Sequence, residues 1–204
     1  MNNKTLVMIG AGGHAKVCYD IAQKMNKWEK IIILDDNPEN DYFEIKGQLN
    51  DIHQYSSADF FVGIGDNKTR EKITKDLLKL NLELITLIHP KAVIASNVKI
   101  DKGTVIMAGV VINSATEIGK GCIINTSSSV DHDNKIGDYV HISPGVHLAG
   151  TVEIGQRTWI GIGTTVINNR KINEDITIGA GSLVLRNVNN KGNYYGQPIK
   201  INKK

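Results

Sequence analysis

Residues 94–117 read IASNVK-IDKGTV-IMAGVV-INSATE, four consecutive hexads that each begin with isoleucine. The spacing of six continues to residue 184 without an insertion, and every position in the series is Ile, Val or Leu. The series is Ile94, Ile100, Ile106, Ile112, Ile118, Ile124, Val130, Ile136, Ile142, Leu148, Ile154, Ile160, Val166, Ile172, Ile178 and Val184. Neither the 3.6-residue period of a helix nor the two-residue period of a strand explains this spacing.

A second regularity lies two residues before each aliphatic position, where the residue is mostly small or β-branched. Asn134 and Arg170 are exceptions to it. Glycine commonly follows the aliphatic residue, as in Ile118-Gly119, and we expect it to serve the tight corners. Hexapeptide repeats predict a parallel β-helix, in which three hexads close one coil of about eighteen residues. Residues 92–187 therefore supply about five coils.

The first part of the chain has a different pattern. We expect a strand over 4–9, a turn over Gly10–Gly13, a helix over 14–25, and strands over 30–36 and 59–66. Asp66 or Asn67 then caps a helix that carries Ile73 and Leu77. Strands that alternate with helices predict a parallel sheet. The expected organisation is a small Rossmann-like βαβ domain over 1–88, followed by an all-β repeat domain over 89–204.

The loop after the first strand raises the question of a dinucleotide. Gly10, Gly12 and Ala15 fit the G-x-G-x-x-G/A fingerprint, and Asp35 lies near the expected place of a ribose-binding acid. A full NAD fold has two mononucleotide halves, however, and this domain has the size of about one. We therefore favour a nucleoside diphosphate attached to a sugar over NAD.

Composition narrows the function classes. The chain has 204 residues, with 41% hydrophobic and 22% charged residues, as in soluble globular proteins. A net charge of +3 suits anionic small molecules and is too small to indicate nucleic acid. Cys18 and Cys122 do not form a disulfide framework and fit a reducing compartment. With no signal-peptide pattern and no apolar run of ~18 residues, we expect a cytoplasmic protein without membrane contact.

His132 is the histidine with the most suggestive surroundings, in NTSSSVDHDNKIG at 125–137. It follows the inward Val130 by two residues, so it falls at a corner, and eighteen residues later Gly150 leaves space and offers a backbone N–H. A histidine with a pKa of ~6.5 suits the removal of an amine proton during acyl transfer. The adjacent Asp133 can orient the ring. The alternative is a solvated corner histidine between two turn acids.

Several motifs, in their order and spacing, resemble one family. They are GAGGHAKV at 10–17, LDD at 34–36, GIGDNKTR at 63–70, HPKAVI at 89–94, INTSSSVDHD at 124–133, HISPGVHLAG at 141–150 and GQPIK at 196–200. The chain resembles the left-handed β-helix acyltransferases of nucleotide sugars. These include the UDP-4-amino-sugar N-acetyltransferases of the bacillosamine pathway and the sialic acid O-acetyltransferase-like proteins.

The resemblance implies an activity and its partners. The reaction would be N-acetylation by acetyl-CoA, without a metal, of the 4-amino group of a nucleotide-linked 4-amino-4,6-dideoxy sugar, with UDP as the expected nucleotide. The assembly would be a homotrimer with active sites between subunits. Direct attack in a ternary complex is expected, since the sequence shows no Cys or Ser nucleophile paired with a base.

The resemblance also implies roles for individual residues. His132 would be the general base and Asp133 its partner, although the family more often has Glu there. The residues expected around the nucleotide sugar are Gly10, Gly12, Gly13, His14, Asp35, Asp36, Gly65, Asn67 and Asn125. Those expected to bind CoA are His141, Gly150, Gly161 and Ala180, with His141 near the acetyl group and the Gly150 backbone serving CoA or the oxyanion.

Simpler interpretations remain for several of these residues. His14 could cap the first helix, Asp35 and Asp36 could be turn acids, and His141 and His147 could be solvated. Three other functions stay open. One is O-acetylation of sialic acid or a related sugar, and another is non-catalytic nucleotide-sugar binding by a trimer. A zinc enzyme on the same fold is disfavoured, because His132, His141 and His147 are spaced to lie on different faces.

Overall fold

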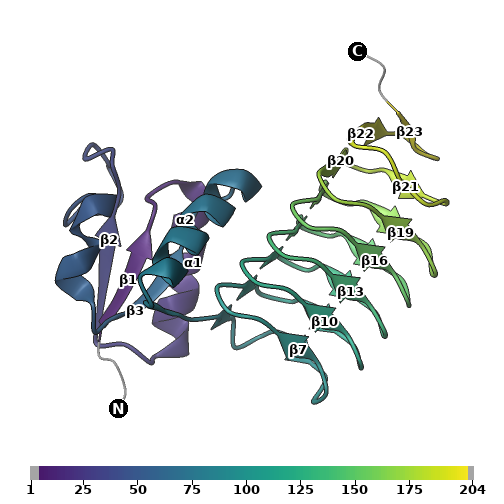
Figure 1. Ribbon diagram of the computed structural model, residues 1–204. Helices are drawn as coiled ribbons and strands as arrows, with labels where there is room; N and C mark the ends of the chain where they lie inside the picture. Colours follow the sequence, from purple (N-terminus) through teal and green to yellow (C-terminus); the bar gives the residue numbers. More distant parts are fainter. Residues whose placement is uncertain (1–4, 202–204) are drawn as a thin grey trace. The chain divides into compact units, whose positions relative to one another are not determined.

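The structure is a computed structural model that describes residues 5–201 (Figure 1). The chain divides into two compact units, the first ending at Pro90 and the second beginning at Lys91. The first is a parallel sheet with helices, and the second is a left-handed parallel β-helix, so the expected fold class is confirmed.

The first unit is built on a four-stranded parallel sheet in the order β2-β1-β3-β4. Its elements are β1 (Thr5–Ile9), α1 (Gly13–Met25), β2 (Lys30–Leu34), the 3-10 helix η1 (Leu49–Tyr55), β3 (Asp59–Val62), α2 (Asn67–Lys79), β4 (Glu83–Leu84) and β5 (Leu87–Ile88). The expected strands over 30–36 and 59–66 end earlier, at Leu34 and Val62, and the polar and glycine residues that follow form loops. Lys4, which the prediction included in the first strand, lies outside the described residues.

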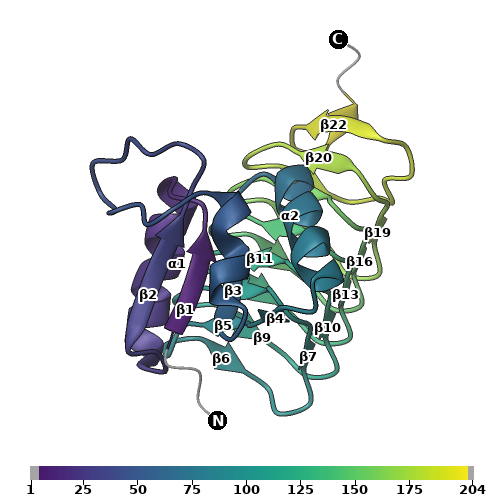
Figure 2. The same ribbon diagram turned by 60° about the vertical axis from the view of Figure 1, so that its left-hand side comes forward.

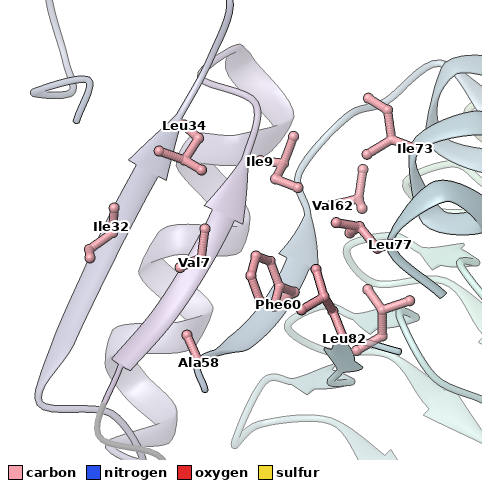
Figure 3. Packing of buried hydrophobic residues seen from close by; sticks show 11 residues of the cluster. Val7, Ile9, Ile32, Leu34, Ala58, Phe60, Val62, Ile73, Leu77 and Leu82 are labelled. Atoms are coloured by element: carbon pink, nitrogen blue, oxygen red, sulfur yellow. The ribbon is translucent and has the colours of Figure 1, made fainter. Parts of the chain in front are cut away.

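The core of this unit lies on both faces of the sheet. Val7, Phe60 and Val62 point to the same side and pack with Ile73 and Leu77 of α2 (Figure 3). The alternate residues of β1, Leu6 and Met8, are fully buried as well. Continuous apolar strands of this kind are typical of a parallel sheet that is covered on both faces.

The second unit stacks short strands into three parallel sheets, whose members follow one another at intervals of eighteen residues (Figures 1 and 2). The Lys135 face consists of β7 (Lys99–Ile100), β10 (Glu117–Ile118), β13 (Lys135–Ile136), β16 (Glu153–Ile154) and β19 (Lys171–Ile172). The His141 face contains β8 (Val105–Ile106), β11 (Ile123–Ile124), β14 (His141–Ile142), β17 (Trp159–Ile160) and β20 (Ile176–Ile178). The His147 face contains β6 (Val93–Ile94), β9 (Val111–Ile112), β12 (Ser129–Val130), β15 (His147–Leu148), β18 (Thr165–Val166) and β21 (Leu183–Val184).

The aliphatic series forms the interior of this β-helix. Each of its members pairs with the member eighteen residues away, as Ile118 does with Ile136. Only Ile94 and Ile100, in the first coil, are partly exposed, and the other members are buried. The period of six therefore marks the inward position, as predicted.

The corners of the β-helix turn at a different hexad position from the one expected, which was the glycine that follows the aliphatic residue. Every sixth residue from Gly103 to Gly181 has a positive φ between 55° and 71°, and many of these, including Asp133 and Thr151, are not glycine. Glycines that follow the aliphatic residue have another reason. At Gly161, for example, a Cβ would lie 2.7 Å from the backbone nitrogen of Ala180 in the next coil. These glycines are needed because adjacent coils approach closely, and the turn itself is made two residues later.

The C-terminal segment closes the His141 face. Here β22 (Gly192–Tyr195) pairs in parallel with β20, and β23 (Lys200–Ile201) pairs antiparallel with β22. Between them Ile199 is buried, so this position of the GQPIK motif packs into the fold.

Candidate functional site

His132 lies in the corner between the His147 face and the Lys135 face, which we call the His132 corner (residues 131–134 and their equivalents eighteen residues apart). Its Nδ1 lies 2.7 Å from Oδ2 of Asp133, and its backbone N–H donates to Oδ1 of Asp131 at 2.8 Å. The shorter aspartate therefore reaches the imidazole. The hydrogen bond with Asp133 raises the pKa of His132 above its ordinary value. When Nδ1 donates to Asp133, Nε2 is left with the lone pair that a general base needs.

Gly150 occupies the same corner one coil further along. A Cβ at this position would lie 2.5 Å from Cε1 and 2.6 Å from Nε2 of His132, so the ring sits where a side chain would otherwise be. Across residues 5–201, the Gly150 N–H donates to no other group of the protein. The predicted pairing of a histidine with an open backbone donor is thus present in this corner.

Asn125, His141 and Trp159 form a second polar group. Asn125 lies in the corner between the His141 and His147 faces, which we call the Asn125 corner, and its Nδ2 is 3.1 Å from Nε2 of His141. The rings of His141 and Trp159 stack with centroids 5.7 Å apart and planes at 3°. Nε1 of Trp159 donates to the Ser143 hydroxyl at 2.7 Å. Sequence analysis missed Trp159 and Ser143, although Trp159 follows His141 by one coil of eighteen residues.

The remaining predicted CoA residues also lie in the Asn125 corner. Gly161 is stacked closely against exposed Ala180, and its lack of a side chain is explained by that packing. A single chain therefore gathers the predicted residues of the β-helix into two groups. His132, Asp133 and Gly150 form one, the Asn125 corner and His141 form the other, and β12 lies between the two corners.

His147 lies on its own face with an unexpected partner. Its side chain is exposed, and its Nδ1 is 2.9 Å from the hydroxyl of Ser129 in the neighbouring strand. The expectation that no serine is paired with a histidine is therefore wrong, because the two residues meet only through the stacking of coils.

In the first unit, the residues expected around the nucleotide sugar lie in three loops, which follow the carboxyl ends of β1, β2 and β3 in that order. Gly10 has a φ of 104°, and a Cβ there would lie 2.9 Å from Cγ1 of Ile64. A Cβ at Gly65 would lie 3.8 Å from the Cβ of His14, so the loops that contain these two residues adjoin. Gly12 and Gly13 face open space, and Gly12 is the N-cap of α1. This arrangement leaves backbone N–H groups at the start of α1 open toward an anion.

Asp35 and Asp36 anchor these loops. The two carboxylate oxygens of Asp35 accept from the N–H groups of Ala11 and Asn37, at 2.7 and 2.8 Å. Asp36 accepts from the N–H of Leu49 at 3.0 Å. The contact of Asp35 with Asn37 is that of a turn acid, whereas the contacts with Ala11 and Leu49 connect segments farther apart in the chain. A carboxylate keeps further lone pairs, so a role toward a ligand stays compatible with them.

His14 is a member of α1 and does not cap it, so that alternative is wrong. Its Nε2 lies 3.4 Å from the sulfur of Cys18. Burial, and then the charge of Arg70, lowers the pKa of His14 to about 4, which keeps the ring neutral at pH 7. Burial raises the pKa of the Cys18 thiol far above its ordinary value.

Arg70, which sequence analysis missed, binds the loop that follows β3 through hydrogen bonds. Only 1% of it is exposed, and its guanidinium donates to the carbonyl oxygens of Ile64 and Gly65, at 3.1 and 2.8 Å. It also donates to Oδ1 of the predicted ligand residue Asn67 at 2.7 Å. The available signal was its helical spacing with Ile73 and Leu77, which places Arg70 on the buried side of α2.

A groove of about 970 Å³ runs along the Lys135 face, and none of the predicted site residues lines it. Lys99, Glu117, Lys135, Glu153 and Lys171 alternate in charge along it. Ion pairs join Lys99 to Glu117 at 2.7 Å and Lys171 to Glu153 at 3.2 Å. These side chains form solvent-exposed ion pairs with one another, and we attribute to them no role in the chemistry.

The part of the chain that the structure describes contains no group of three or more His, Cys, Asp or Glu side chains that could hold a metal ion. No helix within it has the length and apolar character needed to span a membrane.

Comparisons with known proteins match both units. The family model of the PglD N-terminal domain matches residues 5–77. The UDP-N-acetylbacillosamine N-acetyltransferase of Bacillus subtilis is 32% identical over 118 residues, and the GDP-perosamine N-acetyltransferase of Escherichia coli O157:H7 is 35% identical over 98 residues. These matches cover 52% and 44% of those proteins, so the chain spans about half the length of the curated relatives.

Solved structures match over almost the whole chain. The acetyltransferase domain of PglB from Neisseria gonorrhoeae is 33% identical, with a TM-score of 0.93, and the match covers 98% of this chain and 100% of that one. PerB from Caulobacter crescentus, solved with CoA and GDP-perosamine, is 35% identical with a TM-score of 0.92 and 97% coverage of both chains. The resemblance inferred from the sequence is confirmed. The chain belongs to the family of nucleotide-sugar N-acetyltransferases built on a left-handed β-helix.

Proposed function

We propose that this protein transfers the acetyl group of acetyl-CoA to the 4-amino group of a nucleotide-linked 4-amino-4,6-dideoxy sugar. The observation that carries the proposal is the His132–Asp133 pair, which lies beside Gly150, whose N–H donates to no other group of residues 5–201. Relatives support the substrate class, because PerB was solved with CoA and GDP-perosamine, and the PglB domain with acetyl-CoA.

The corner supplies what acyl transfer to an amine requires. The amine nitrogen attacks the thioester carbonyl carbon while Nε2 of His132 accepts an amine proton. The carbon–sulfur bond then breaks, and the CoA sulfur leaves and takes up a proton. The Gly150 N–H is suited to stabilise the negative charge on the carbonyl oxygen. Asp133 holds the imidazole in the productive tautomer and stabilises its protonated form.

Direct attack by the amine is the mechanism we propose. Cys122 is buried, and its sulfur lies 3.1 Å from the carbonyl oxygen of Gly137, so it is a poor nucleophile. The Ser129–His147 pair offers a second route through an acyl-serine. A Ser129→Ala variant separates the two routes, because only the acyl-serine route loses its nucleophile.

The first unit would hold the nucleotide diphosphate and the sugar. Gly10, Gly12, Gly13 and His14 form the loop at the start of α1, and Gly65 adjoins it. UDP is the nucleotide we propose, and GDP is the main alternative because relatives of both kinds match.

A homotrimer would join the two polar groups of the β-helix. Exposed apolar side chains lie on the His141 and His147 faces and in the Asn125 corner, whereas the Lys135 face is charged. They are Val93, Val111, Trp159 and Ile162, with 63%, 37%, 48% and 56% exposed. We propose that these surfaces meet a second copy, so that His132 of one subunit lies near the Asn125 corner of the next. The free, buried cysteines fit a reducing compartment, for which we propose the cytoplasm.

The decisive experiment measures CoA release from acetyl-CoA with UDP-, dTDP- and GDP-linked 4-amino-4,6-dideoxy sugars and with sialic acid. We expect release with one amino sugar and a loss of about 10²–10⁴ in kcat for His132→Ala. Release with sialic acid alone would favour the O-acetyltransferase. Sugar-nucleotide binding without release from any acceptor would favour the non-catalytic alternative. An active His132→Ala variant would overturn the assignment of the base.

A further inference from the structure

Asn134 interrupts the hexad pattern directly after His132 and Asp133. It occupies the inward position that Thr116 holds one coil earlier and Val152 one coil later, and its side chain is fully buried. A buried amide must form hydrogen bonds, since leaving it unpaired carries a large desolvation cost. The question is therefore which groups Asn134 binds.

Threonines at the same inward position show the ordinary arrangement. The hydroxyl of Thr104 donates to the carbonyl of Gly119 at 2.8 Å and accepts from the N–H of Cys122 at 2.9 Å. Thr116 binds the carbonyl of Asp131 and the N–H of Asn134 in the same way. We call this pair of bonds, from one inward side chain to the next coil, the coil stitch.

Asn134 makes the coil stitch and adds further bonds. Its Nδ2 donates to the carbonyl of Ala149 at 3.0 Å, and its Oδ1 accepts from the N–H of Val152 at 3.2 Å. Nδ2 also donates within its own corner, to the carbonyls of Asp131 at 2.7 Å and His132 at 3.3 Å. A threonine hydroxyl has a single proton to donate and cannot form both sets.

We propose that Asn134 is a positioning residue that fixes the backbone of His132 relative to Gly150. This inference rests on the proposed role of His132 as the general base. The His132 side chain is 56% exposed, so packing does little to hold it. The charged neighbours Asp131 and Asp133 belong to the same corner and move with it. Backbone bonds also hold this corner, from the Asp133 N–H to the Ser114 carbonyl at 3.0 Å and from the Thr151 N–H to the His132 carbonyl at 2.9 Å. The amide of Asn134 adds side-chain bonds that link the carbonyls of Asp131 and His132 to that of Ala149, just before Gly150.

Asn134→Thr tests the proposal, because threonine can keep the coil stitch and loses the bonds inside the corner. We expect kcat to fall about tenfold, as for a misplaced catalytic group, with unchanged KM values and a melting temperature near that of the native protein. We also expect the NMR titration of His132 to move toward lower pH, because the contact with Asp133 loosens. Asn134→Ser provides the same comparison if the threonine variant does not fold.

Thr104→Val is the matched control, since it removes a coil stitch in a corner away from His132. It should lower the melting temperature and leave kcat unchanged. An Asn134→Thr variant with native kcat and native His132 titration would overturn the proposal. A loss of activity that is fully explained by a lowered melting temperature of the variant would overturn the proposal as well. His132→Ala is assayed in parallel: if it stays active, the proposed base is wrong, while the His132 titration still tests the positioning.

Discussion

At the scale of single residues, the proposed chemistry depends on how Asp133 and Gly150 are placed around the imidazole of His132. Asp133 has a φ of 59°, and the chain turns there, so its carboxylate can fold back onto the side chain that precedes it. Gly150 provides room for the ring and an open donor beside it. The sequence predicts both properties from the spacing of His132, Asp133 and Gly150, and the corner geometry sets the distances between them.

Replacement of Asp133 by asparagine tests the pKa of the base. Asp133 raises the pKa of His132, and only the unprotonated ring accepts a proton, so activity is lost as pH falls through this raised value. In Asp133→Asn the acid limb of the kcat/KM profile should move to lower pH, toward 6.5, and the plateau should fall. The profile is measured between about pH 5 and 9. Asp101→Asn, which also removes a corner carboxylate, should leave the limb unmoved, and an unmoved limb in Asp133→Asn would contradict the assignment.

Gly150→Ala should remove activity while keeping the fold. Its Cβ would lie 2.5 Å from the His132 ring, which is exposed and can swing away. We expect kcat to fall by about 10²-fold with an almost unchanged melting temperature. Ser114→Ala, in the equivalent corner position one coil before His132, serves as the control. Native activity in Gly150→Ala would show that the ring position in this structure is not the productive one.

At the scale of elements, α2 contributes more than an apolar face. Ile73 and Leu77 pack onto the sheet, and Arg70 on the same side binds the loop that follows β3. A buried side chain of α2 therefore helps to fix the conformation of the loop that contains the predicted ligand residues Gly65 and Asn67. The sequence indicated the helix with Asp66 or Asn67 as its cap, and the structure shows that Asp66 is the N-cap.

Arg70→Met should weaken binding of the nucleotide sugar. The variant leaves the carbonyls of Ile64 and Gly65 without this donor, which costs about 1–3 kcal/mol of stability, and it loosens the loop. We expect KM for the nucleotide sugar to rise about tenfold, with KM for acetyl-CoA unchanged. Lys72→Met removes the same charge from the exposed side of α2 and should change neither constant. Equal increases in both KM values would contradict a specific effect of Arg70 on the binding of the nucleotide sugar.

For the whole molecule, the separation of His132 from the Asn125 corner is the central fact. One chain places the two polar groups on different corners, and in the proposed trimer a neighbouring copy would bring them together. The exposed apolar residues of the His141 and His147 faces are suited to such contacts. The charged Lys135 face is suited to solvent.

Mixing of two inactive variants tests whether the site is shared. One chain carries His132→Ala, and the other carries Asn125→Ala together with His141→Ala. If subunits share sites, random mixing in trimers restores about a quarter of them, whereas each variant alone stays inactive. The readout is CoA release after co-expression, with the trimer verified by light scattering. No recovery in mixed trimers would place the complete site within a single chain.

The sequence by itself determined the β-helix, since a period of six over sixteen aliphatic positions leaves no other regular structure. It also indicated the βαβ unit and the His132–Asp133 pair, because these depend on local spacing. Only the tertiary structure decided which side chains meet across coils, such as His141 with Trp159 and Ser129 with His147. It also revealed the dual bonding of Asn134 and the buried position of Arg70. These contacts depend on side-chain rotamers and on the stacking of residues eighteen apart, which hydrophobic periodicity does not encode.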